Sequence, residues 1–233
     1  MPRKPSPWRR LTTATRWPVG VTLTSWRYLW RTTPMHRTEE EGDPGADAPP
    51  PLPGGVSLEE VQEPGDGAGP LFHRRYRTRI RETGHTPESL IALVTENLDR
   101  VAPREFASFQ KVGGDEGEMR VGDEFVVRMP GPWDGPVRVV ERTPCAFRLV
   151  TLASHLEAGQ IEFRARREGD LLVFEIESWA RSGDRLSNLL YTHLRMAKET
   201  QLHMWISVLE RVAERSGGRM TDGIEIHTRK VAA

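Results

Sequence analysis

Residues 184–215 read DRLSNLLYTHLRMAKETQLHMWISVLERVAER and contain neither proline nor glycine. Asp184 is a typical N-cap residue, and Gly217 and Gly218 follow the stretch as a C-terminal stop. At about 100° per residue, the apolar side chains fall on one stripe, opposite charged ones. The stripe contains Leu186, Leu190, Ala197, Met204, Val208 and Val212, widened on one side by Leu194, Trp205 and Leu209. The sequence therefore predicts one C-terminal amphipathic helix, about 45 Å long, that needs a broad apolar surface to lie on.

Ahead of this helix, residues 106–180 contain short apolar and β-branched stretches that are typical of strands. Turn residues such as Gly113-Gly114 and Gly169-Asp170 separate them. Because the strands follow one another closely, antiparallel hairpins are the expected topology. The predicted strands are Phe106–Lys111, Asp123–Met129, Val137–Arg142, Ala146–Leu152, Gln160–Arg166 and Leu171–Ala180.

One more strand and a short helix precede these six strands. Residues 71–81 alternate apolar and basic side chains, which predicts a strand with one strongly basic face. Thr86 and Pro87 provide the N-cap and first-turn proline of a helix that ends at Pro103. The sequence thus predicts an α+β fold of the helix-grip type. In it a curved antiparallel sheet of about six to seven strands wraps around the long C-terminal helix.

Three stretches within residues 71–218 resemble an uncharacterised family catalogued as domain of unknown function number 1990. They read VGDEFVVRMPGPWDGPVRV (residues 121–139), HLEAGQIEF (155–163) and FEIESWAR (174–181). The wider resemblance is to the helix-grip superfamily of START-related, polyketide-cyclase-like and birch-pollen-allergen-like proteins. It implies a cavity between sheet and helix that holds an apolar or amphipathic ligand. Members of that superfamily range from lipid carriers to cyclases, and the narrower family brings no activity with it.

The charges are balanced overall, 33 basic against 33 acidic, but they are segregated near the N-terminus. Residues 1–38 carry eight basic residues and no acid, whereas residues 39–70 carry nine acids and no base. The Pro/Gly-rich stretch 39–68 has few apolar residues, which favours a linker. We therefore expect a basic arm at 1–38, an acidic linker at 39–68, a helix-grip domain at 69–218 and a tail at 219–233.

The basic arm is rich in tryptophan and contains a short amphipathic pattern. Pro18 is suited to open a helix, on which Val19, Leu23, Trp26 and Trp30 share one face. One hypothesis places residues 16–31 on an anionic membrane surface, as a peripheral contact. The alternative packs this helix on the chain's own domain. No nucleic-acid partner is expected, because no known binding motif accompanies the charges.

Cys145 is the single cysteine, so the chain can form neither an internal disulfide nor a CxxC zinc site. We expect a cytoplasmic protein. The alternative is a protein that associates with a membrane through the arm. Arg9-Arg10 is followed by a poor signal-peptide core, which argues against secretion. We expect no cofactor and no bound metal, and the oligomeric state stays open.

His155, Glu157 and Glu177 are the candidates for acid–base catalysis. His155 and Glu157 lie at a predicted strand junction, where the alternative role is to satisfy backbone groups. Glu177 shares a strand face with Glu175 and Trp179. If that face is solvated, both glutamates are ordinary surface residues. If Glu177 instead faces a cavity beside Trp179, burial predicts a raised pKa and a role as an acid.

The candidates for ligand contact are Trp133, Trp179, His193, Gln201 and Met204. Trp133 lies on a proline-bounded loop, where it either acts as a lid or packs over the end of the sheet. Gln201 falls within the apolar stripe of the long helix, with His193 at its edge. A glutamine in a dry core is unfavourable, so this position indicates either a hollow core or a hydrogen bond to a strand carbonyl.

Three hypotheses for function follow from these features. The first is a soluble helix-grip module that binds a small apolar or amphipathic ligand between sheet and helix. The second is a cyclase- or hydratase-like enzyme that uses the same cavity. The third is a peripheral membrane adaptor that acts through the arm. Polar groups that converge in the cavity favour the enzyme, and an aliphatic lining favours the carrier.

Overall fold

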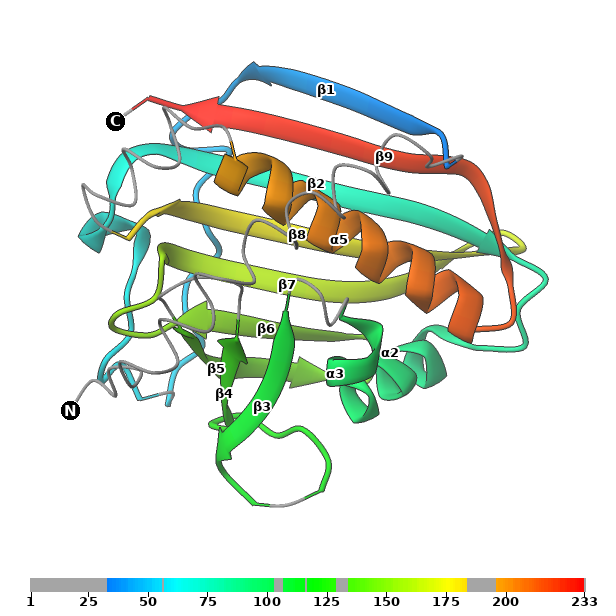
Figure 1. The fold of residues 1–233 in the computed structure, drawn as a ribbon, viewed down its shortest axis with the longest axis horizontal. Coiled ribbons are helices and arrows are strands. Elements are labelled where there is room, and N and C mark those ends of the chain that lie inside the picture. Colours follow the sequence, from blue (N-terminus) through cyan, green and yellow to red (C-terminus); the bar gives the residue numbers. More distant parts are fainter. Residues whose placement is uncertain are drawn as a thin grey trace, which may run out of the picture.

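The chain folds around one curved, open β-sheet, and a long helix crosses one face of it (Figure 1). The computed structural model describes residues 33–55, 57–102, 107–115, 117–128, 134–183 and 196–232, and of residues 134 and 196–201 the backbone only. The elements within these ranges are β1 (Met35–Glu41), the 3-10 helix η1 (Pro64–Asp66), β2 (Ala68–Arg81), α2 (Pro87–Glu96), α3 (Leu98–Val101), β3 (Ser108–Gly113), β4 (Glu124–Arg128), β5 (Asp134–Thr143), β6 (Ala146–Thr151), β7 (Glu157–Glu168), β8 (Leu171–Ser182), α5 (Met196–Arg215) and β9 (Arg219–Val231).

The strand order in the sheet is β1-β9-β2-β8-β7-β6-β5-β4-β3. Neighbouring strands are antiparallel except β1 and β9, which run parallel. From β2 to α5 the chain follows the predicted order of one strand, a helical segment, six strands and a long helix. The helix-grip fold is therefore confirmed, although the sheet has nine strands rather than six to seven.

The two additional strands lie where an arm, a linker and a tail were expected. Residues 219–231 form β9, which pairs with both β1 and β2, so the predicted tail is wrong. Ile224 and Ile226 of β9 alternate with polar residues and are buried, which is a strand pattern. β1 spans the predicted boundary at residue 38, and its side chains are mostly exposed. Backbone pairing holds β1 in place, so apolar alternation could not reveal it.

Both predicted helices are present, with corrections at their ends. Thr86 caps α2, and its hydroxyl accepts a hydrogen bond from the backbone N–H of Ser89 at 3.3 Å. The predicted single helix is divided at Asn97 into α2 and α3. α5 ends at Arg215 as predicted, and Gly217 adopts a φ of 68°, which suits a helix-closing glycine. The predicted start of the long helix at residue 184 lies outside the described residues.

The main apolar core lies between the sheet and the helices that cover one of its faces. We call this face the helix-facing side and the opposite face the outer side. Alternation along each strand separates the two, because successive side chains point to opposite faces. The largest fully buried side chains are Tyr76, Phe147, Phe163, Phe174, Ile80, Leu90, Ile91, Leu149, Leu172, Ile176, Ile206 and Leu209.

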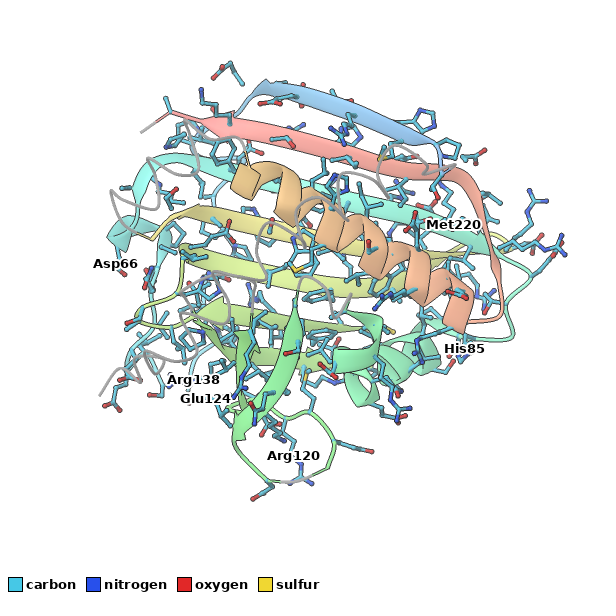
Figure 2. All side chains as sticks on the ribbon, viewed as in Figure 1. Asp66, His85, Arg120, Glu124, Arg138 and Met220 are labelled. Carbon is cyan, nitrogen blue, oxygen red and sulfur yellow. The ribbon has the colours of Figure 1, made fainter. Side chains whose placement is uncertain are left out.

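The predicted linker lies across the outer side of the sheet as an ordered segment. We call residues 42–55 and 57–67 the strap. Arg138 of β5 donates hydrogen bonds to the strap carbonyls of Ser57 and Glu59 at 2.9 and 2.8 Å. It also pairs with Glu124 of β4 at 2.6 Å (Figure 2). A proline-rich backbone makes few hydrogen bonds of its own, so its carbonyls are available to donors from the sheet.

Candidate functional site

On the helix-facing side, Trp205 of α5 packs against a pair of phenylalanines. Phe163 of β7 and Phe147 of β6 are direct cross-strand neighbours, and their rings stack at 4.6 Å between centroids. The Trp205 ring meets Phe163 edge-on at 5.6 Å. Trp205 is 6% exposed, and its Nε1 has no hydrogen-bond acceptor among the described residues. A buried N–H without an acceptor costs about 1–3 kcal/mol, so this position is a candidate contact for a polar atom that those residues do not supply.

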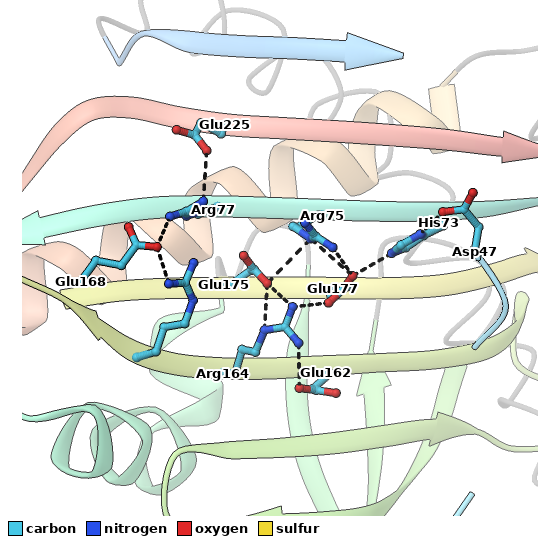
Figure 3. A network of polar contacts seen from close by, with 11 residues as sticks. Asp47, His73, Arg75, Arg77, Glu162, Arg164, Glu168, Glu175, Glu177 and Glu225 are labelled. Atoms are coloured by element: carbon cyan, nitrogen blue, oxygen red, sulfur yellow. Dashed lines mark hydrogen bonds and ion pairs between the residues drawn. The ribbon is translucent and has the colours of Figure 1, made fainter. Parts of the chain in front are cut away.

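The outer side carries a network of charged residues, which we call the outer network (Figure 3). Arg164 of β7 donates to both Glu175 and Glu177 of β8, and Arg75 of β2 bonds Glu177 at 3.0 Å. Glu175 and Glu177 are only 3% and 4% exposed, so the expectation of solvated glutamates is wrong. The network contains Asp47, His73, Arg75, Arg77, Arg79, Glu162, Arg164, Arg166, Glu168, Glu175, Glu177, Glu225 and Arg229.

His73 joins the strap to the outer network. Its Nδ1 lies 2.7 Å from Oδ1 of Asp47 in the strap, and its Nε2 lies 2.7 Å from Oε1 of Glu177. Both ring nitrogens of His73 thus lie within hydrogen-bonding distance of a buried carboxylate oxygen. Trp179 stacks on this ring at 5.1 Å between centroids. Asp47, His73 and Glu177 form a charged clamp between strap and sheet.

Both carboxylates of the clamp are held in the ionised form. Burial alone raises the pKa of Glu177. The hydrogen bond from His73 and the charges and hydrogen bonds of Arg164 and Arg75 outweigh burial and lower that pKa to about 2. The pKa of Asp47 is also lowered, because hydrogen bonds, first of all that with His73, outweigh its burial. The alternative prediction of a raised pKa at Glu177 is therefore wrong, and Glu177 has no proton to donate near neutral pH.

His155 and Glu157 lie at the junction of β6 and β7, where the ring of His155 contacts backbone atoms of Glu157. Nδ1 of His155 lies 2.9 Å from the backbone N and 3.0 Å from the backbone O of Glu157. Burial lowers the pKa of His155 more than the charge and backbone of Glu157 raise it. Glu177 of β8 lies directly opposite Glu162 in the register of β7 and β8. Glu162 is five residues from Glu157 along β7, so Glu177 and Glu157 are roughly 16 Å apart along the strand direction, at about 3.3 Å per residue. The three catalytic candidates therefore do not meet at one centre.

The predicted ligand contacts are distributed over both sides of the sheet. Met204 is buried in the main core on α5, beside Trp205 in the sequence. Trp179 instead lies on the outer side, where it also packs with Leu71 and Val231. Outside the described residues lie Trp133, His193 and the side chain of Gln201.

The amphipathic arm predicted at residues 16–31 also lies outside the described residues. Thr33, which follows it closely, donates a hydrogen bond to Glu210 of α5 at 2.8 Å. In the described part of the chain, no helix is long and apolar enough to cross a membrane. The same part contains no group of three His, Cys, Asp or Glu residues placed to bind a metal ion.

Sequence reasoning did not single out Asp47 or Arg74. Asp47 belongs to an acidic, proline-rich stretch and has no local signal that separates it from its neighbours. Arg74 had a signal, because Arg74 and Arg75 are consecutive in a predicted strand. Consecutive strand residues face opposite sides, so one of the two had to lie on the apolar side.

A family model described as Domain of unknown function (DUF1990) matches residues 59–217 of the chain. No curated protein matches the sequence. Among solved structures, a hypothetical protein from Helicobacter pylori is 9% identical with a TM-score of 0.46, over 61% of this chain and 86% of that chain. A conserved protein from Geobacillus kaustophilus and norcoclaurine synthase from Thalictrum flavum are each 10% identical with a TM-score of 0.45, over 64% of this chain and 98% of theirs. Similarity at this level carries no inference about function.

Proposed function

This chain belongs to the DUF1990 family, and we propose that it is a binding protein that holds a small apolar or amphipathic ligand between α5 and the sheet. The observation that carries the proposal is the buried Nε1 of Trp205, which has no acceptor among the described residues. Native proteins leave few buried donors unsatisfied, and a bound molecule is one of the ways to satisfy them.

The surroundings of Trp205 indicate what kind of ligand would fit there. The rings of Phe163 and Phe147 supply an apolar floor, and Met204 belongs to the same core. A ligand in this place has an apolar body and one acceptor within reach of the indole N–H. Pockets of this kind obtain affinity from apolar contact and orientation from a few polar groups.

Replacement of Trp205 by phenylalanine is expected to weaken binding of Nile red, a neutral apolar dye with a carbonyl acceptor, by about five- to tenfold. The change removes the N–H and part of the apolar surface. Trp179→Phe is the matched control, since it makes the same substitution on the outer side and is expected to leave the affinity unchanged. The measurement is a fluorescence titration, with near-ultraviolet circular dichroism to show that both variants keep native packing.

Two results of this titration would contradict the proposal. One is a wild-type protein that does not bind the dye, and the other is an equal effect of the two substitutions. Native mass spectrometry of the protein purified from its own host is an independent test, in which the natural ligand is expected as a co-purified mass. Its loss in Trp205→Phe and its retention in Trp179→Phe are the expected outcome.

A further inference from the structure

A small hollow lies on the outer side of the sheet, where β2 and β9 run next to each other. It has a volume of about 160 Å³ and is lined by His73, Arg75, His227 and Arg229. In register, His73 lies opposite Arg229, and Arg75 lies opposite His227. Neighbouring strands are about 5 Å apart, and successive residues on one face are about 7 Å apart. The four basic side chains therefore start from the corners of a small rectangle.

The carboxylates next to this hollow lie around it rather than in its lining, which among the described residues is basic throughout. Glu177 of β8 bonds Arg75 at 3.0 Å from one side, as Figure 3 shows. Glu40 of β1 bonds Arg229 at 2.8 Å from the opposite side of the strand pair, and Asp47 of the strap contacts Arg229 at 3.3 Å. These contacts hold both guanidinium groups in place at the walls.

Three donor groups at the hollow have no partner in the described part of the chain. Arg75 uses Nε and Nη2 for its carboxylate contacts, which leaves Nη1. Arg229 uses Nε and Nη1, which leaves Nη2. The exposed ring of His227 makes no hydrogen bond or ion pair with the described residues. The donors thus come from two strands and from different corners of the same hollow.

These donors suit a compact anion with several oxygen atoms. The edge of a planar guanidinium matches the oxygens of a phosphate or a carboxylate, and an imidazole supplies at least one further N–H. A tetrahedral phosphate presents oxygens in several directions, as donors on three side chains require, whereas a carboxylate presents its two in one plane. The side chains of Arg75 and Arg229 are 44% and 46% exposed, so an anion from solvent can reach both.

We propose that this hollow binds a phosphate group, with Arg75, Arg229 and His227 as its donors. His73, the most buried of the four lining residues, forms the floor, since both its nitrogens already contact carboxylates. The site is separate from the proposed ligand site at Trp205, because the two lie on opposite sides of the sheet. The phosphate group belongs to a soluble phosphate ester or to a lipid head group, which share this chemistry.

The test is a titration with inorganic phosphate at about pH 7, followed by the NMR signals of the histidine ring C–H groups. The signals of His227 and His73 are expected to shift and to saturate with a dissociation constant of about 1 mM. Binding tighter than this is not expected, because the surrounding carboxylates offset part of the positive charge. The signal of His85, which lies outside the hollow, and a titration with sodium chloride at equal ionic strength are the controls.

Replacement of Arg229 by glutamine is expected to weaken phosphate binding about tenfold, because it removes a charged donor from the wall. Arg219→Gln is the matched control, since Arg219 lies on the same strand, contacts Glu82 at 3.5 Å and is outside the hollow. It is expected to bind phosphate as the wild type does. Circular dichroism shows whether both variants keep the native fold. His227→Gln alters an exposed ring without described bonds and is expected to weaken binding severalfold.

The outcomes decide the assignment. Shifts that grow linearly with phosphate, or that sodium chloride reproduces, would indicate an adventitious ion only and overturn the site. Unchanged affinity in Arg229→Gln overturns it as well, and should this variant not fold, His227→Gln decides on the same criterion. Two further arms identify the source of the phosphate. Saturable binding of glycerol 3-phosphate assigns it to a soluble ester. Sedimentation with vesicles of phosphatidylcholine and phosphatidic acid, lost in Arg229→Gln, assigns it to a lipid head group.

Discussion

Replacement of Glu177 by glutamine is expected to lower the free energy of unfolding by about 3 kcal/mol at pH 7. The carboxylate accepts bonds from His73, Arg75 and Arg164, and its pKa falls from the usual 4.5 to about 2. Its side chain is only 5% exposed, so solvent screens these contacts little. Glutamine keeps the shape but not the charge, and it leaves the guanidinium groups of Arg75 and Arg164 with one anion fewer. Urea unfolding followed by circular dichroism measures the difference.

The dependence of this difference on pH follows from the direction of the pKa change. A carboxyl group with a depressed pKa in the folded state stabilises the protein fully above its unfolded pKa, which is 4.5 here. That contribution is lost as the pH falls through the folded value of about 2. Wild-type protein and Glu177→Gln are therefore expected to differ at pH 7 and to converge between pH 4.5 and 2. A constant difference over that range would show that the loss has another origin than the charge.

Glu162→Gln is the matched control for this substitution. Glu162 is the direct cross-strand partner of Glu177 in the register of β7 and β8. Its pKa is raised, because burial outweighs the nearby charges of Arg164 and Arg148. Its charged form is thus disfavoured in the folded protein, and glutamine is expected to leave the free energy of unfolding at pH 7 unchanged or higher. A loss as large as that of Glu177→Gln would contradict the assignment of these pKa directions.

Removal of residues 33–68 is expected to lower the free energy of unfolding by more than about 5 kcal/mol. The segment contains β1 and the strap, and each of its hydrogen bonds to the sheet contributes about 0.5–1.5 kcal/mol. Asp47 is lost with it, which leaves His73 with one carboxylate instead of two. The bonds connect Pro50, Pro51, Ser57, Glu59, Glu60 and Gln62 of the strap with Gln160, Arg148, Arg138, Ala153 and Thr151 of the sheet.

The measurement compares urea unfolding of a chain that begins at Thr33 with one that begins at Gly69. The two differ by residues 33–68, which contain β1 and the strap, so the comparison isolates the contribution of that segment. The domain boundary predicted from the sequence at residue 69 gives the opposite expectation, an autonomous domain that keeps its stability. Equal stability within about 1 kcal/mol would support that boundary and show that the strap is dispensable.

Much of the fold could be predicted because its signals are local. The six strands from β3 to β8 follow from period-2 alternation and turn residues, and the predicted ranges overlap the observed ones. The end of α5 at Arg215 follows from the glycines after it, and the start of α2 follows from Thr86 and Pro87. The alternation in β2 also predicted the basic face on which His73 and Arg75 lie. Each of these features depends on residues within a few positions of one another.

The candidate site was less accessible from the sequence, because its residues come together from distant segments. His73 and Asp47 are 26 positions apart, and His73 and Glu177 are 104 positions apart. Periodicity states that Glu175, Glu177 and Trp179 share a face, but not whether that face is covered. Arg75 of β2 and Arg164 of β7 cover the two glutamates, and Asp47 of the strap reaches this group at His73. The strap carbonyls that accept hydrogen bonds from the sheet belong to prolines and polar residues without a recognisable pattern. The same limit applies to Trp205, whose place in the apolar stripe gives no indication that its N–H lacks an acceptor.

The sequence by itself determined the order of strands and helices, the face on which each strand residue lies, and thereby the helix-grip architecture. It did so because backbone geometry links side-chain direction to position in the chain. Only the tertiary structure decided that the glutamates of β8 are buried and bonded to arginines, that residues 219–231 form β9, and that the predicted linker is a strap across the sheet. These outcomes depend on the charges and donors that other strands bring alongside, and the ionisation and burial of a side chain are set by such neighbours in space.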